Sequence, residues 1–177
     1  MAIRDQKVYV LDLPVLASSD TQGFIDMEGD PDGRFVYLIG LLVVRDGKET
    51  CHSFWADTRE DEAAIFEQLD RALTDLACSR LFHYGLYEAR VLKRAAPRLQ
   101  QAHLSHLADT SLTNVLSEIY SKIYFPTYSN SLKDIAAYLG YDWRTPGATG
   151  LDAMVWRAAA GNPATTTRSN KVSSNTT

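Results

Sequence analysis

The segment Phe24-Ile25-Asp26-Met27-Glu28-Gly29 places two acidic residues at alternate positions of an apolar stretch, which is typical of a β-strand. Side chains two residues apart in a strand share one face, roughly 7 Å apart. Two neighbouring carboxylates repel each other unless a cation lies between them, and their oxygens suit Mg²⁺ or Mn²⁺. The alternative is the solvated face of an edge strand, the commoner setting for an isolated Asp-x-Glu pair.

Turn and strand signals surround this segment. Residues 29–33 contain two glycines and a proline and predict a turn, and the apolar run Phe35–Val44 predicts a long second strand. Asp46-Gly47 is a hairpin signal, after which Glu49–Trp55 returns as a third strand. The three strands are therefore expected to form an antiparallel meander. A shorter strand over Val8–Leu13, ended by Pro14, is expected before them.

The period then changes to that of helices. Glu60–Leu76 predicts a helix with Thr58 or Asp57 as its N-cap, and Arg80–Tyr84 predicts a short strand. A helix over Leu86–Ala96, stopped by Pro97, follows this strand. Strand, helix and strand in this order predict a crossover and hence a parallel strand pair. Further helices are expected over Thr110–Tyr124, Ser131–Leu139 and Asp152–Ala160. The predicted fold class is α/β, a mixed sheet flanked by helices.

Length and composition favour one globular domain. The 177 residues carry 18 basic and 22 acidic side chains, so the mild negative charge argues against wrapping of long duplexes, although a local basic groove stays open. No apolar run approaches the ~20 residues that span a bilayer, and the N-terminus lacks a signal-peptide layout. Two cysteines cannot build a disulfide framework. We therefore expect a soluble cytoplasmic protein without a membrane partner.

The end of the sequence differs from the rest. Residues 161–177 contain five Thr, three Ser and three Asn, with Val172 as the one sizeable apolar residue. Such a segment buries too little surface to offset the entropy of ordering it. We therefore expect a folded domain over residues 1–160 and a disordered tail over residues 161–177.

A third acidic residue, Glu88, follows the predicted strand in the segment Phe82-His83-Tyr84-Gly85-Leu86-Tyr87-Glu88. It falls in the first turn of the next helix, where the helix dipole favours a carboxylate. That position also lies at the carboxyl end of a parallel strand, where open α/β sheets bind ligands. If this strand lies beside Asp26 and Glu28, the three carboxylates converge. Both interpretations stay open.

Three stretches, 25–29, 82–88 and 131–135 with Leu139-Gly140, resemble the YprB-like RNase H-like domain of the DnaQ-type (DEDD) 3′–5′ exonuclease superfamily, which often accompanies RecB-family nuclease domains. The resemblance covers roughly residues 23–161. It implies an RNase H-like fold over 1–160 and metal-dependent hydrolysis of phosphodiester bonds in DNA or RNA. It also implies Asp26, Glu28 and Glu88 as catalytic metal ligands, Mg²⁺ or Mn²⁺ as cofactor, and a RecB-like nuclease or helicase domain as partner.

The sequence departs from this family at two places. Glu88 stands where the wider superfamily has Asp, and the third motif, similar to Tyr-Asn-x-x-Asp-Cys and carrying another Asp, is missing. Asp152 and Asp109 are candidate replacements for the missing Asp of this motif, and Asp152 is a further candidate metal ligand. Asp152 also fits a helix N-terminal acid, and Asp109 a cap or structural residue. The resemblance thus implies a truncated or impaired copy of a nuclease.

Basic side chains follow Glu88. Arg90, Arg94 and Arg98 recur every four residues and are expected to share one helical face, with Lys93 nearby. The candidate nucleic-acid-binding residues are Arg90, Lys93, Arg94 and Lys133, the last of which follows the expected N-cap Ser131. Phosphate contacts would offset the repulsion between an acidic site and a polyanion. A solvated surface is the alternative for each of them.

Other residues have weaker signals. His83 is expected to be a satisfied histidine at a strand end. Tyr84 and Tyr87 fit either stacking on a terminal base or packing at the rim of the core. Trp143 and Trp156 are expected in the core. The alternatives to an enzyme are a non-catalytic nucleic-acid-binding or accessory domain, and a decayed fragment without a function of its own.

Overall fold

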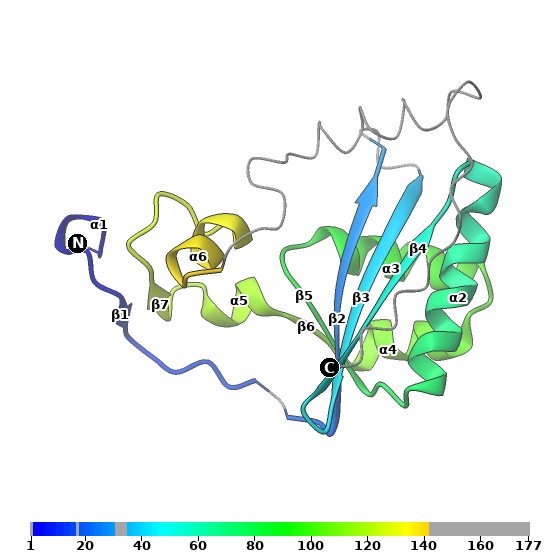
Figure 1. Ribbon diagram of the computed structural model, residues 1–177, viewed down its shortest axis with the longest axis horizontal. Coiled ribbons are helices and arrows are strands. Elements are labelled where there is room, and N and C mark those ends of the chain that lie inside the picture. Colours follow the sequence, from blue (N-terminus) through cyan, green and yellow to red (C-terminus); the bar gives the residue numbers. More distant parts are fainter. Residues whose placement is uncertain (1, 17, 31–34, 142–177) are drawn as a thin grey trace. The chain divides into compact units, whose positions relative to one another are not determined.

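A five-stranded mixed sheet forms the centre of the computed structural model, which describes residues 2–16, 18–30 and 35–141 (Figure 1). The strand order is β4-β3-β2-β5-β6. The bounds are β2 (Thr21–Gly29), β3 (Val36–Arg45), β4 (Lys48–Trp55), β5 (Arg80–His83) and β6 (Leu112–Asn114). Strands β2, β3 and β4 are antiparallel neighbours, and β5 pairs parallel with both β2 and β6. The predicted meander and the predicted change to parallel pairing are both confirmed.

Three helices cover one face of this sheet: α2 (Glu62–Asp75), α3 (Tyr87–Arg98) and α4 (Ala102–Thr110) (Figure 1). A short 3₁₀ helix, η1 (Arg59–Asp61), precedes α2. Its N-cap is Thr58, whose backbone nitrogen donates a 3.0 Å hydrogen bond to Oδ2 of Asp61. The core lies between the helices and the sheet. Its fully buried residues include Ile39, Leu41, Ile65, Phe66, Leu69, Leu73, Leu81 and Leu92.

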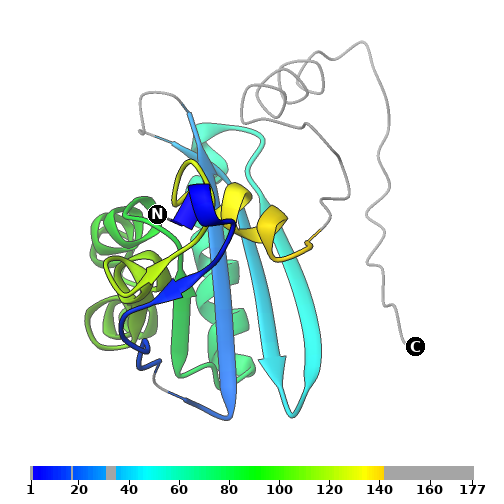
Figure 2. The same cartoon turned by 90° about the vertical axis from the view of Figure 1, so that its left-hand side faces the viewer.

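A smaller group of elements lies on the other side of the sheet, where α1 (Ala2–Asp5, blue) and α6 (Leu132–Tyr138, yellow) stand in front of the strands in Figure 2. It also contains α5 (Val115–Ile119) and a separate antiparallel pair, β1 (Tyr9–Val10) with β7 (Ile123–Tyr124). The predicted N-cap of α6 is confirmed, because Oγ of Ser131 accepts a 3.1 Å hydrogen bond from the backbone of Asp134. The hydroxyl of Tyr84 donates to the Asn130 carbonyl and ties this group to the end of β5.

Several element predictions were wrong. The helix expected over Thr110–Tyr124 is β6, α5 and β7, because parallel pairing of β6 with β5 overrides local helical spacing. Helix α4 was not predicted. Pro97 does not stop α3, which continues to Arg98, since a proline in the last turn removes only one hydrogen bond. The strand expected over Val8–Leu13 is reduced to β1.

Some predictions concern residues outside the described ranges. These are the turn residues 31–34, the helix over Asp152–Ala160, both Trp143 and Trp156, and the tail over 161–177. Among the described helices, none has the length and apolar character that crossing a bilayer requires.

Candidate functional site

Asp26 and Glu28 share one face of β2, as predicted. Ile25 and Met27, which alternate with them, are 5% and 4% exposed and point into the core beneath the helices. The side chains of Asp26 and Glu28 therefore point to the side of the sheet that faces away from α2, α3 and α4. In the register, Asp26 lies opposite Gly40 and Glu28 opposite Leu38.

Glu88 reaches the same edge of the sheet through a sharp turn after β5. Strand β5 ends at His83, Gly85 adopts a left-handed conformation with φ of 98°, and α3 begins at Tyr87. The turn is held by Asn114, whose Oδ1 accepts a 3.1 Å hydrogen bond from the Gly85 nitrogen. Because β5 runs parallel to β2, the two strands end at one edge. Glu88 therefore lies in the first turn of α3 near the end of β2, and is 5% exposed.

The three carboxylates share one electrostatic environment. The pKa of Asp26 is raised from 3.8 to about 6, first by desolvation and then by the negative charges of Glu28 and Glu88, against a backbone hydrogen bond from Met27 that lowers it. Like charges in proximity disfavour the ionised form of each group. The charges of Glu28 and Glu88 therefore both act on the Asp26 carboxyl, and the role of the three carboxylates as metal ligands stays a prediction.

Buried polar atoms without a hydrogen-bond partner collect around Glu88. Within the described residues, Nδ1 of His83, the hydroxyl of Tyr87 and Oε2 of Glu88 are all buried and unpartnered. Nδ1 of His83 lies 3.7 Å from Oε2 of Glu88, too far for a good hydrogen bond. The prediction that His83 is a satisfied histidine was wrong. Buried polar groups are nearly always partnered, so this concentration marks a place where a ligand or water is expected.

The two tyrosines of this turn have different surroundings. Burial raises the pKa of Tyr84, and its hydroxyl donates to a backbone carbonyl, which fits packing rather than base stacking. Burial also raises the pKa of Tyr87, as do the charges of Asp30, Glu28 and Glu88, whereas Arg94 lowers it. The phenol of Tyr87 therefore lies among the acidic residues, with Arg94 on the same side of α3.

The basic residues of α3 divide into two groups. Arg90, Lys93 and Arg94 are exposed on the helix. Arg98 instead donates a 3.0 Å hydrogen bond from Nη2 to Oε2 of the buried Glu62, so the last arginine of the predicted stripe has a structural partner. Lys133 is exposed in the first turn of α6.

The other predicted acids do not join the site. Asp109 is exposed at the end of α4, next to the start of β6, and thus at the opposite edge of the sheet from Glu88. Asp152 lies outside the described residues. Among the residues that the structure describes, no group of three or more His, Cys, Asp or Glu is arranged to hold a metal ion. The donor set of Asp26, Glu28 and Glu88 suits a hard cation in charge and atom type, but it is not a preassembled cage.

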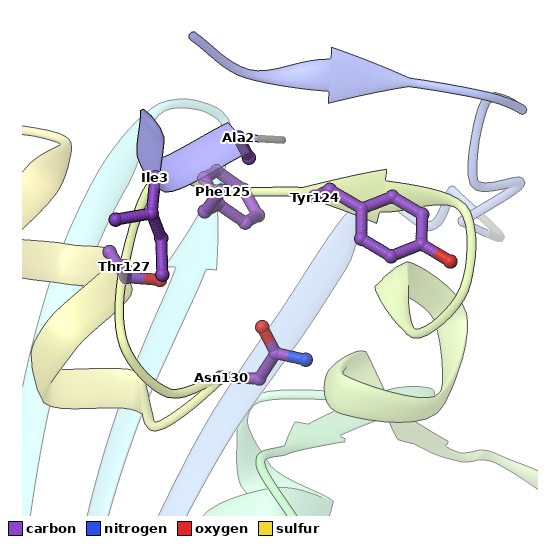
Figure 3. A pocket seen from close by; sticks show the side chains of 6 residues that line it. All are labelled: Ala2, Ile3, Tyr124, Phe125, Thr127 and Asn130. Carbon is purple, nitrogen blue, oxygen red and sulfur yellow. The ribbon is translucent and has the colours of Figure 1, made fainter. Parts of the chain in front are cut away.

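A pocket of about 250 Å³ lies beside α1 and the segment after β7 (Figure 3). Its lining residues carry no charged side chain: Ala2, Ile3, Tyr124, Phe125, Thr127 and Asn130. None of them is a predicted site residue. The candidate site is therefore the edge of the sheet that carries Asp26, Glu28 and Glu88, termed here the carboxylate edge, rather than this pocket.

The mixed sheet, with acidic side chains at the carboxyl edge of its parallel strands, defines an RNase H-like α/β domain. The family model described as the RNase H superfamily matches residues 23–159, about three quarters of the sequence, and the chain belongs to this family. No curated protein and no solved structure matches the chain.

Proposed function

We propose that this protein is a metal-dependent nuclease of the 3′–5′ exonuclease type, which hydrolyses phosphodiester bonds in DNA or RNA with an incomplete carboxylate set. The observation that supports this most directly is the raised pKa of Asp26, caused in part by Glu28 and Glu88. An acidic group whose pKa is raised by neighbouring acids at a ligand-binding edge is typical of functional sites. A structural surface gains nothing from such repulsion.

Asp26, Glu28 and Glu88 would hold Mg²⁺ or Mn²⁺. A bound divalent ion supplies an activated water and stabilises negative charge on a phosphate. The protein's own contribution would be to bring together carboxylates from the end of β2 and from the first turn of α3. The unpartnered Oε2 of Glu88 fits this role, because a buried carboxylate oxygen without a donor is costly unless a ligand satisfies it.

Arg90, Lys93 and Arg94 would contact the phosphate backbone beside these acids. Arg94 is the best supported, since its charge acts on Tyr87, the residue before Glu88. Lys133 is a further candidate from α6. These contacts would hold a polyanion next to a cluster of negative charge and would weaken with rising salt. A RecB-like nuclease or helicase domain is the proposed partner, which rests on the resemblance of the sequence motifs.

A non-catalytic nucleic-acid-binding or accessory domain is the second candidate. One observation favours it: the described residues hold no ready-made group of three metal ligands. In that case the basic face of α3 would bind nucleic acid without cleavage.

Metal binding separates the two candidates. We expect Mn²⁺ or Mg²⁺ to raise the melting temperature, because a ligand of the folded state stabilises it, and Asp26→Ala to abolish the rise. Asp109→Ala is the matched control, since Asp109 is an exposed acid at the far edge. Cleavage of single-stranded DNA or RNA in the presence of Mn²⁺ should be lost in Asp26→Ala and retained in Asp109→Ala. Nucleic-acid binding without metal binding or cleavage would reject the nuclease in favour of the accessory domain.

A further inference from the structure

Tyr87 occupies the space that a side chain on Gly29 would need. A Cβ atom built on Gly29 would lie 2.0 Å from the Tyr87 hydroxyl oxygen and 3.2 Å from its Cζ. The carbonyl oxygen of Phe35 would be 3.0 Å away. Gly29 is not among the glycines with positive φ, so its backbone does not require glycine. The absence of a side chain is needed for the tyrosine ring.

This contact joins the two halves of the carboxylate site. Gly29 directly follows Glu28 at the end of β2, and Tyr87 directly precedes Glu88 in the first turn of α3. The ladder between β2 and β3 shifts register between Glu28 and Gly29, so regular pairing does not extend through this point. Tyr87 and Glu88 are consecutive residues of this turn, so a backbone shift that relieves a clash at the Tyr87 ring would also move Glu88.

We propose that Tyr87 is a positioning residue of the carboxylate site formed by Asp26, Glu28 and Glu88. The packing of its ring against Gly29 sets the position of Glu88 relative to Glu28. This inference rests on the proposed function and adds two residues to it. The aromatic ring of Tyr87, rather than its hydroxyl, performs this positioning. Its hydroxyl has no hydrogen-bond partner among the described residues, so removal of the oxygen leaves no group unsatisfied.

The test is a double-mutant cycle read as Mn²⁺ affinity, measured from the electron paramagnetic resonance signal of free Mn²⁺ in the full-length chain. Gly29→Ala should weaken Mn²⁺ binding roughly tenfold, because the new methyl group displaces the ring. Tyr87→Phe should stay within about twofold of wild type, because the ring remains. In the double variant the 2.0 Å contact with the hydroxyl is gone, whereas the contacts with Cζ at 3.2 Å and with the Phe35 carbonyl oxygen at 3.0 Å remain, so affinity should be higher than in Gly29→Ala.

Two other glycines provide matched controls. Gly23→Ala, in the same strand, would bring a methyl group 2.9 Å from Sγ of Cys78 and Cδ1 of Leu81, so it should lower the melting temperature but not the Mn²⁺ affinity. Gly40→Ala, opposite Asp26, meets only the carbonyl oxygen of Asp26 at the ordinary contact distance of 3.8 Å, so it should leave the melting temperature unchanged. Circular dichroism of each variant checks that it is folded.

Failure has two distinguishable forms. If wild type binds Mn²⁺ and Gly29→Ala binds it equally well, or if Tyr87→Phe does not restore binding to Gly29→Ala, the positioning role is rejected and the nuclease proposal survives. Equal weakening by Gly23→Ala would also reject it, since loss of stability alone would then explain the effect. If wild type binds no Mn²⁺, the proposed function fails and the positioning role with it.

Discussion

Oδ1 of Asn114 accepts two backbone hydrogen bonds at once, from Gly85 and from Leu116, each 3.1 Å long. The first holds the turn between β5 and α3, and the second caps α5. One side chain at the end of β6 therefore supports the turn that presents Glu88 at the carboxylate edge.

Asn114→Ala should lower the free energy of unfolding by about 1–2 kcal/mol, because it removes an N-cap and leaves the Gly85 nitrogen unpaired. Asn114→Asp keeps an acceptor at the same position and should retain most of the stability. Chemical denaturation of both variants measures this. Equal losses in both would show that the oxygen at this position is not what holds the turn.

The stability of the metal-free protein should depend on the titration of Asp26. Its pKa in the folded state, about 6, exceeds the unperturbed 3.8, so the folded chain holds this proton more tightly than the unfolded chain. The stabilising effect of protonation is therefore present at low pH and is lost as the pH rises from about 4 to about 6.

Asp26→Asn removes this titration. In a metal chelator the variant should be more stable than wild type at neutral pH by about 1 kcal/mol, a value reduced for solvent screening of an exposed group, and the difference should vanish near about pH 4. Thermal melts across this range measure it. A constant difference at all pH values would contradict the assignment of the shift to Asp26.

Replacement of Arg94 should affect nucleic-acid binding, whereas replacement of Arg98 should affect stability. Arg98→Ala leaves the buried Glu62 with one partner, the Val36 nitrogen, and should cost about 1–2 kcal/mol of stability. Its effect on affinity for a single-stranded oligonucleotide should be small. Arg94→Ala should lower that affinity several-fold at low salt. The reverse pattern would contradict the division of the basic residues proposed here.

Tyr84→Phe distinguishes packing from base stacking. The variant keeps the ring and loses the hydrogen bond to the Asn130 carbonyl, so the melting temperature should fall by an amount that corresponds to about 1 kcal/mol. Oligonucleotide affinity should not change. A variant with unaltered stability would show that the hydroxyl does not hold the segment before α6.

The central part of the fold could be predicted because its signals are local. Alternation in β2, the long apolar run of β3 and the Asp46-Gly47 turn each act within a few residues, and all three strands follow them. Strand β6 could not be predicted in this way. Leu112–Asn114 has only three residues, and it becomes a strand because β5 offers a parallel partner.

The candidate site shows the same division. The shared face of Asp26 and Glu28 follows from the geometry of a strand, and the place of Glu88 in a first turn follows from Gly85. The lack of a hydrogen bond at Nδ1 of His83 and the role of Asn114 carry no signal in the sequence. Both depend on which strand lies beside β5.

The sequence by itself determined the antiparallel meander of β2, β3 and β4, the alternation that puts two carboxylates on one side of β2, and the presence of a helix directly after the turn at Gly85. The tertiary structure decided that Glu88 couples to Asp26, that Tyr87 fills the space above Gly29, and that Arg98 pairs with Glu62. The physical reason is the distance along the chain over which each effect acts. Periodicity and turn propensity act over a few neighbouring residues, whereas desolvation, charge repulsion and steric fit depend on side chains that only the folded sheet brings together.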